Sequence, residues 1–191
     1  MVKVLGISGS PRRSGSTEML LDEALRGASS AGAVTDKLIL NDLSLRPCQG
    51  CGGCGKTGVC VTEDDMGLVY DKVGDSDSII IASPVYFGSV SAQLKTMIDR
   101  FNSHWVRKSF LKKPVSKKKN RRGAFLCVGE TEKAAFFKNA KSIVGYFFNT
   151  LDVVYSKEIF YSRILKDGDE KKKWRLLKKS FDMGRVLAGR S

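Results

Sequence analysis

Histidine is almost absent from this chain of 191 residues, in which His104 is the single example. A serine or cysteine hydrolase of the common kind needs a histidine base beside its nucleophile. His104 has no companion motif that would give it this role. We therefore expect no hydrolytic site. No catalytic residue is predicted from the sequence.

Long apolar runs are also missing. No stretch approaches the roughly 20 residues that a membrane-spanning helix requires, and the first ten residues lack the apolar centre of a secretory signal. Neither an internal repeat nor a linker-like stretch interrupts the chain. We expect one domain over residues 1–191, with no membrane association, in the cytoplasm, where thiols stay reduced.

Acidic residues are few beside basic ones, with 20 Asp and Glu against 33 Lys and Arg and a net charge of +13. The basic residues concentrate in two stretches, 107–122 and 171–179, and the first contains no acid. Such stretches attract polyanions or acidic proteins. Nucleic acid is not favoured because no zinc-finger or RNA-binding signature accompanies the charge. An ordinary solvated surface remains the alternative.

Apolar runs typical of buried strands alternate with stretches whose apolar residues recur at helical spacing. The predicted strands cover residues 2–8, 34–40, 78–83, 123–128 and 153–161. Helices are expected at 17–31, 64–74, 91–106 (with Ser91 as the N-cap), after Thr131, and at 168–187. The helix after Thr131 has a predicted core face of Phe136, Phe137, Ala140, Ile143, Val144, Phe147 and Leu151. This alternation predicts one three-layer α/β domain with a five-stranded parallel sheet.

Ligands of such sheets bind beyond the carboxyl ends of the strands, here at loops 8–17, 83–90 and 128–131. The first loop, SGSPRRSGST, lacks the lysine of a Walker A loop and the glycine spacing of a dinucleotide fingerprint. Its hydroxyls and arginines at a helix N-terminus suit a phosphomonoester. The candidate binding residues are Ser8, Ser10, Arg12, Ser14, Ser16 and Thr17. An ordinary Ser- and Gly-rich turn is the alternative.

Two of these loops resemble those of the flavodoxin-like, NADPH-dependent FMN reductase superfamily. The first loop resembles the family's Gly-Ser-Pro-Arg-x-x-Gly-x-Thr, which holds the FMN phosphate, and residues 83–101 (SPVYFGSVSAQLKTMIDRF) resemble its second flavin loop and following helix. The resemblance covers about residues 1–155 and implies a sheet of order 2-1-3-4-5. It also implies flavin contacts from Pro84, Val85, Tyr86, Phe87, Gly88 and Gly129. Tyr86 and Phe87 could instead be core aromatics.

Four of the five cysteines lie close together, at Cys48, Cys51, Cys54 and Cys60, among five glycines. The C-x2-C-x2-C spacing is that of bacterial ferredoxins, so a [4Fe–4S] cluster is the favoured ligand. Structural zinc prefers two separated C-x2-C pairs and fits less well. Thiol redox chemistry, or no ligand at all, is the third alternative. Cys127, at the end of a predicted strand, is expected to be a small buried hydrophobe.

The complete cysteine motif, followed by VTEDDM, is similar to that of the iron–sulfur flavoprotein family. The resemblance implies a cluster-binding loop at 47–62 after the second strand and a homodimer-based assembly, either a dimer or a tetramer. It also implies electron exchange with ferredoxin and reduction of small acceptors such as dioxygen or peroxide. Ferredoxins are commonly acidic, which would suit the basic stretches. From its place after the second strand we expect the loop at the same sheet end as the flavin loops.

Nearby charges have plainer explanations than catalysis. Asp99 and Arg100 match an Asp-Arg pair of the family, and an ion pair explains them at least as well as a catalytic role. Asp64 lies at the start of a predicted helix, where an acid offsets the helix dipole.

The sequence thus favours an electron-transfer flavoprotein that binds FMN and one [4Fe–4S] cluster. An NAD(P)H-dependent FMN or quinone reductase without a cluster is the second hypothesis. A basic FMN-binding or nucleic-acid-binding regulator with a zinc-stiffened loop is the third.

Overall fold

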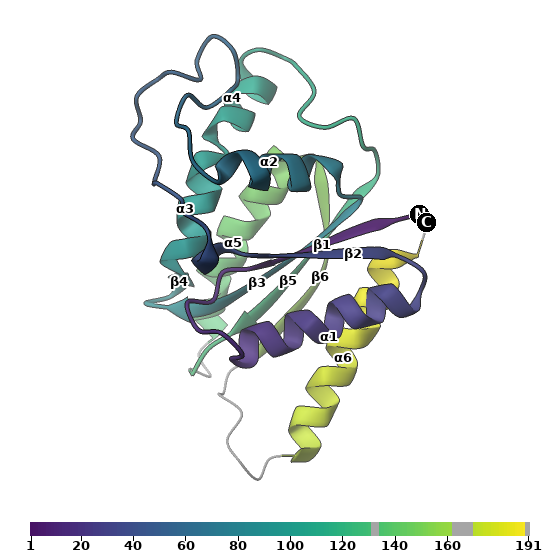
Figure 1. Cartoon of the computed structure of the whole chain (residues 1–191). Coiled ribbons are helices and arrows are strands. Elements are labelled where there is room, and N and C mark those ends of the chain that lie inside the picture. Colours follow the sequence, from purple (N-terminus) through teal and green to yellow (C-terminus); the bar gives the residue numbers. More distant parts are fainter. Residues whose placement is uncertain (131–133, 162–169, 190–191) are drawn as a thin grey trace.

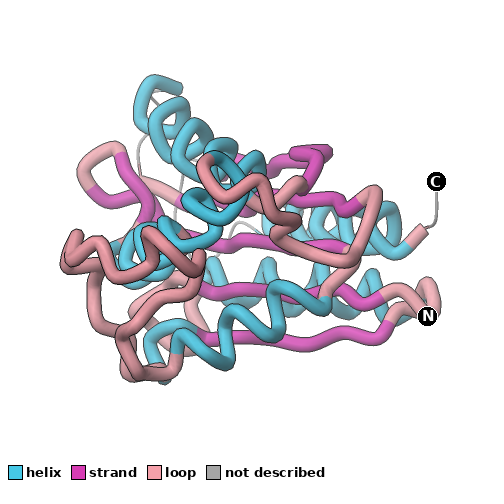
Figure 2. Tube along the Cα trace, turned by 90° about the horizontal axis from the view of Figure 1, so that it is seen from above, coloured by secondary structure: helices cyan, strands magenta, loops and turns pink. Residues whose placement is uncertain are grey.

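The computed structural model describes residues 1–130, 134–161 and 170–189. Its middle layer is a parallel sheet in the order β2-β1-β3-β5-β6, whose strands run side by side in Figure 2. Their bounds are β1 (Lys3–Ser8), β2 (Val34–Ile39), β3 (Ser78–Tyr86), β5 (Arg121–Val128) and β6 (Val153–Tyr161). Counted along the chain as the five predicted strands, this order is 2-1-3-4-5. The predicted flavodoxin-like arrangement is therefore confirmed.

Helices cover both faces of the sheet (Figure 1). One face carries α1 (Ser16–Ser30) and α6 (Glu170–Ala188). The other carries α2 (Met66–Asp75), α3 (Ala92–Arg100), α4 (Asn102–Ser109) and α5 (Ala134–Thr150). A short 3₁₀ helix, η1 (Leu40–Asp42), follows β2. Among the described residues no helix is both long and apolar enough to cross a membrane.

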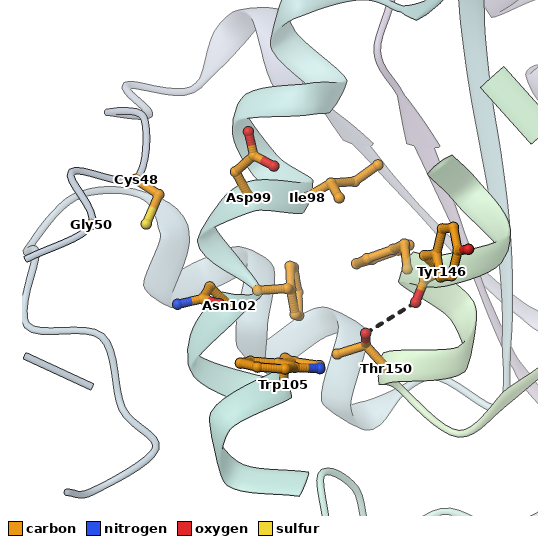
Figure 3. A pocket seen from close by; sticks show the side chains of 10 residues that line it. Cys48, Gly50, Ile98, Asp99, Asn102, Trp105, Tyr146 and Thr150 are labelled. Atoms are coloured by element: carbon orange, nitrogen blue, oxygen red, sulfur yellow. Dashed lines mark hydrogen bonds between the residues drawn. The ribbon is translucent and has the colours of Figure 1, made fainter. Parts of the chain in front are cut away.

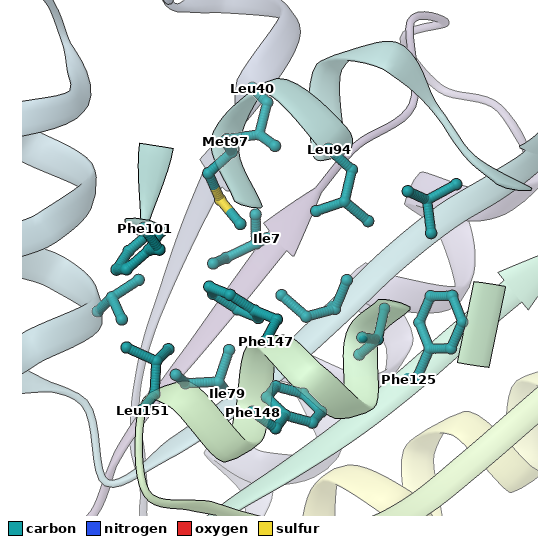
Figure 4. Close-up of a cluster of buried hydrophobic side chains, with 14 of the residues drawn as sticks. Ile7, Leu40, Ile79, Leu94, Met97, Phe101, Phe125, Phe147, Phe148 and Leu151 are labelled. Carbon is teal, nitrogen blue, oxygen red and sulfur yellow. The ribbon is translucent and has the colours of Figure 1, made fainter. Parts of the chain in front are cut away.

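The central strand β3 contributes side chains to a separate core on each face, because successive residues of a strand point to opposite sides. Ile79 and Ile81 belong to the core under α2, α3 and α5, part of which Figure 4 shows. Ile80 and Ala82 belong to the core under α1 and α6. All four are fully buried, which explains why residues 79–82 of β3 are all apolar.

Helix α5 packs as its spacing predicts, with one exception. Phe137, Ala140, Val144 and Phe147 are buried, whereas Phe136 is 38% exposed. Successive helical residues are 100° apart, and here Phe137 faces the core while Phe136 lies at the edge of the buried face. The prediction that Phe136 belongs to the core face was wrong. Thr131, the predicted cap, and residues 168–169 lie outside the described residues.

Two local features depart from the prediction near the carboxyl end of β3. The expected helix over 91–106 is two helices, because α3 ends at Arg100 and α4 begins at Asn102. Ser91 is the N-cap of α3 as predicted, and its Oγ accepts a hydrogen bond from the Leu94 N–H at 3.2 Å. Strand β3 runs on to Tyr86 and forms a hairpin with the short strand β4 (Ser89–Val90), in a region that the sequence predicts as a loop.

Candidate functional site

The first candidate site is a pocket of about 480 Å³ at the carboxyl ends of β1, β3 and β5. It brings together three loops that are far apart in the sequence, as expected for a sheet of this kind. Its lining is Ser10, Arg12, Ser14, Gly15, Ser16, Thr17, Pro84, Val85, Tyr86, Val128, Gly129 and Glu130. Nine of the twelve predicted flavin residues are in this lining. Tyr86 lines the pocket and is 43% exposed, so it is not a core aromatic.

The loop after β1 is shaped by its own hydroxyl groups. Ser10 Oγ accepts from the Arg12 N–H at 3.1 Å and donates to the Arg12 carbonyl at 3.0 Å, which turns the chain tightly. Helix α1 then begins after Gly15, and no side chain caps its first turn. The first N–H groups of a helix have no partner within the helix. These donors, with the four Ser and Thr hydroxyls of the lining, suit an anionic group such as a phosphate monoester.

The two arginines of this loop differ in their ion-pair partners. Arg13 forms ion pairs with Asp42 and with the buried carboxylate of Glu18. Arg12 lines the pocket, and none of the carboxylates in the described part of the chain pairs with it. Arg12 is therefore the cation available to a bound anion. Glu18 also accepts from the Ser14 N–H at 2.6 Å and from Lys37 at 3.1 Å.

Burial by itself raises the pKa of Glu18, but the hydrogen bonds from Ser14 and Lys37 outweigh it, so the pKa lies below its ordinary value. Glu18 is thus ionised, and it forms ion pairs with Lys37 and Arg13. Sequence reasoning gave this residue no role because its partners come from β2 and from the loop itself.

Three predicted flavin residues lie outside the pocket lining. Ser8 is buried, and its Oγ accepts from the Ser10 N–H. Phe87 is fully exposed at the turn between β3 and β4, where its φ is 49°. Gly88 follows in the same turn with φ 73°, and its carbonyl accepts from Asn139 at 2.9 Å. The hairpin directs Phe87 away from the lining, and no spacing in the sequence marked that turn.

The lining also includes three residues that were not among the candidates. Gly15 offers only backbone atoms, so a search for hydroxyl and charged side chains passed over it. Val128 and Glu130 flank Gly129 in the third loop, and all three border the pocket. A Cβ at Gly129 would lie 3.4 Å from both Phe137 and Val85, so the third loop packs closely there.

The second candidate site is the cysteine loop. All four clustered cysteines line one pocket, together with Arg100, Asn102 and Ser103 from α3 and α4. Cys48 and Cys51 are exposed, whereas Cys54 and Cys60 are half-buried. Glycines 50, 52 and 58 have φ between 62° and 73°, a conformation that other residues rarely adopt. Cys127 is buried in the core as expected, and burial raises the pKa of its thiol.

The donor set fits a cluster by its chemistry, although the loop is not an assembled metal site. The cavity between the thiols is small, about 30 Å³, and among the described residues no three Cys, His, Asp or Glu side chains are gathered as the ligands of a metal ion are. Four thiols around one pocket are nevertheless the ligands that a [4Fe–4S] cluster takes. We conclude that the loop holds the right donors and that its four sulfur atoms would have to move to surround a cluster.

The two sites are separate within one chain. The cysteine loop leaves the carboxyl end of β2 but then lies beside α3 and α4, while the phosphate loop adjoins the start of α1 (Figure 1). No residue lines both pockets. The loop starts at the sheet end of the flavin loops, as expected, and its cysteines line a pocket separate from theirs.

A groove of about 450 Å³ adjoins the cysteine loop between α3, α4 and α5 (Figure 3). Trp105 and Tyr146 come from opposite walls of the groove, and Cys48 lies at its edge. Asp99 also borders it and forms an ion pair with Lys95 at 2.7 Å, within helix α3. Asp99 is thus half of an intrahelical pair, one of the two explanations that the sequence left open.

The chain matches the family described as NADPH-dependent FMN reductase over residues 2–152. It is 38% identical over 142 residues to an iron–sulfur flavoprotein of Methanosarcina thermophila, which covers 74% of this chain and 71% of that protein. An iron–sulfur flavoprotein of Methanocaldococcus jannaschii is 48% identical over 99 residues, 52% of this chain and 51% of the relative. The match thus spans about half the length of that relative.

Solved structures of low sequence identity share the fold of this chain, and the likeness concerns the fold alone. An NAD(P)H:quinone oxidoreductase from Methanothermobacter marburgensis superposes with a TM-score of 0.75 at 16% identity, over 99% of this chain and 97% of that one. An archaeal flavodoxin superposes with a TM-score of 0.59 at 11% identity, over 98% and 96% of the two chains.

Proposed function

The chain belongs to the NADPH-dependent FMN reductase family and, within it, to the iron–sulfur flavoproteins, and from this membership we propose that it is an FMN-dependent oxidoreductase that transfers electrons between FMN and one [4Fe–4S] cluster. FMN, when bound, exchanges electrons singly or in pairs, and the cluster exchanges them singly. The observation that carries the proposal is that all four motif cysteines line one pocket.

In this proposal the first pocket holds FMN. Arg12 and the uncapped N-terminus of α1 bind the phosphate, helped by hydroxyls of the same loop. Pro84, Val85 and Tyr86 form the wall against which the flavin ring lies, with Gly129 beside Val85. Phe87 and Gly88 lie outside the lining, so they contact the flavin only after a movement of the hairpin turn. None of these side chains needs to transfer a proton.

The thiolates of Cys48, Cys51, Cys54 and Cys60 hold the cluster in this proposal. The motif supports Cys60 as the fourth ligand because the chain contains no second cysteine set that could compete for it. Asn102 Nδ2 lies 4.0 Å from Cys54 Sγ and is positioned to donate to that sulfur. Hydrogen bonds to ligand sulfurs are one of the means by which proteins tune such centres.

The partners that the sequence suggested remain part of the proposal. An acidic one-electron carrier of the ferredoxin kind supplies or accepts electrons, and dioxygen or peroxide is the small acceptor. A homo-oligomer is included because the two pockets share no residue in one chain, so a second copy could bring a flavin to the cysteine loop. The cytoplasmic location stays a prediction.

The test is an iron and acid-labile sulfide assay on protein purified without oxygen. We expect about four irons and four sulfides per chain, with one FMN. Cys60→Ala should lower the iron content and change the cluster's absorption, while Cys127→Ala, which removes the buried thiol, should leave both unchanged. Zinc, or no metal, in the wild-type protein would contradict the proposal. Rapid bleaching of the flavin by NADPH alone in such a metal-free protein would favour the cluster-free reductase instead.

A further inference from the structure

Arg100 is a buried cation at the base of the cysteine loop. It is the last residue of α3, and its side chain is only 1% exposed. Charged side chains are almost never this buried unless they are paired. Its partner is Asp64, whose carboxylate it contacts through both terminal nitrogens, at 2.5 and 3.1 Å. The pair is thus bidentate and withdrawn from solvent.

The same guanidinium ties the two ends of the cysteine loop together. It donates to the Arg46 carbonyl at 2.8 Å, just before the first cysteine, and to the Thr62 carbonyl at 3.1 Å, just after the last. Asp64 completes the closure by accepting from the Arg46 N–H at 2.9 Å. Arg100 therefore holds Arg46 and Thr62, which flank the four-cysteine segment, at a fixed distance from each other.

One nitrogen of Arg100 takes no part in closing the loop. Its Nε is buried without a hydrogen-bond partner in the described structure, which is rare for a native side chain. Arg100 also lines the cysteine pocket, together with all four clustered cysteines. The positive charge is thus directed at the pocket that the thiols share.

We propose that Arg100 is a positioning residue that holds the cysteine loop closed and is the buried charge that raises the reduction potential of its cluster. This inference rests on the proposed function, because it concerns a cluster held by the four cysteines. Reduction adds an electron to the cluster, so a nearby positive charge in a poorly screened site stabilises the reduced form. Asp64 opposes this effect, since its negative charge offsets the guanidinium.

Four variants separate charge from structure. Arg100→Gln removes the buried charge, and Arg100→Lys keeps the charge but loses the two-pronged contact. Asp64→Asn removes the opposing charge. Lys95→Gln is the matched control, because it removes one positive charge from the exposed side of the same helix.

The first measurement is the midpoint potential of the cluster in iron-loaded protein, titrated without oxygen. We expect a more negative potential for Arg100→Gln, a more positive one for Asp64→Asn, and values close to wild type for Arg100→Lys and Lys95→Gln. Asp64→Asn keeps the test informative if Arg100→Gln does not fold. Equal potentials in all the folded, iron-loaded proteins would overturn the electrostatic role of Arg100.

The second measurement is amide hydrogen exchange in the metal-free protein. We expect faster exchange across residues 46–64 in Arg100→Lys than in wild type, and no change in Lys95→Gln. Unchanged exchange in Arg100→Lys would overturn the positioning role. Wild-type protein that takes up no iron overturns the proposed function instead, and the exchange experiment still decides whether Arg100 holds the loop.

Discussion

At the scale of single residues, the two neighbouring arginines of the phosphate loop differ in what they can bind. Arg13 is engaged by Asp42 and Glu18, whereas Arg12 lines the first pocket without a carboxylate partner among the described residues. We predict that Arg12→Gln weakens FMN binding about 10- to 100-fold, since a hydrogen bond to a charged group contributes about 1.5–3 kcal/mol. Fluorescence titration with FMN measures this.

Riboflavin is the control ligand for that prediction because it lacks the phosphate. Its affinity should be nearly the same in Arg12→Gln and wild type, and Arg13→Gln should affect FMN less than Arg12→Gln does. An equal loss for riboflavin and FMN would show that Arg12 does not act on the phosphate.

The buried carboxylate of Glu18 leads to a pH prediction at the same scale. Its pKa is lowered in the folded chain, so its contribution to stability is complete above the unfolded pKa, about 4.3, and is lost as the pH falls through the folded value. We expect Glu18→Gln to cost about 1–3 kcal/mol at pH 7. Urea unfolding of the FMN-free protein should show this difference shrinking between pH 5 and pH 3. A difference that stays constant with pH would contradict the assignment.

At the scale of elements, α1 and α6 approach each other more closely than side chains allow. A Cβ on Gly184 would lie 1.8 Å from the Ala24 carbonyl oxygen, and one on Gly27 would lie 2.0 Å from the Phe181 oxygen. We predict that Gly184→Ala destabilises the protein by about 3 kcal/mol, because backbone atoms must move apart. Gly67→Ala in α2 is the control, since nothing lies within 4 Å of its added Cβ. Urea unfolding measures both, and equal stability of the two variants would disprove the close crossing.

Most helices and strands were predictable from the sequence, and the features that were missed depend on contacts between distant segments. Strand β6 has the predicted bounds, since apolar content and period decide a strand locally. The interruption between α3 and α4 was missed because Phe101 continues the apolar spacing across it and is itself buried. The candidate site shows the same limit. Residues on the phosphate loop were predictable from their types, whereas the contact of Arg100 with Asp64 depends on how α3 meets a distant loop.

At the scale of the whole molecule, much of the basic stretch 107–122 is used in folding. Arg121 is buried and donates to the carbonyls of Ser76 and Leu151, at 3.0 and 3.2 Å. Lys108 pairs with Asp152, and Lys118 pairs with Asp77. The remaining lysines of the segment make no ion pair within the described parts of the chain. These are Lys112, Lys113, Lys117 and Lys119.

The segment that carries the unpaired lysines begins beside the cysteine loop. Arg107 Nε donates to the Pro114 carbonyl at 2.8 Å, and a Cβ on Gly58 would lie 2.8 Å from the Arg107 side chain. Arg107 thus contacts both the cysteine loop and the lysine-bearing segment. The second basic stretch belongs to α6, on the other face of the sheet (Figure 1). An acidic electron carrier steered by charge should therefore approach the cysteine loop over the first stretch.

We predict that changing Lys112, Lys113 and Lys117 together to Glu slows reduction of the protein by reduced ferredoxin about tenfold or more at low salt. The same triple change at Lys171, Lys173 and Lys179 of α6 is the control and should slow it much less, because equal charge is altered on the far face. Stopped-flow absorbance measures both rates. Near 1 M salt the Debye length falls to about 3 Å, so the two variants should then converge. Equal slowing by both triple variants at low salt would mean that net charge, and not a docking surface beside the cysteines, governs the encounter.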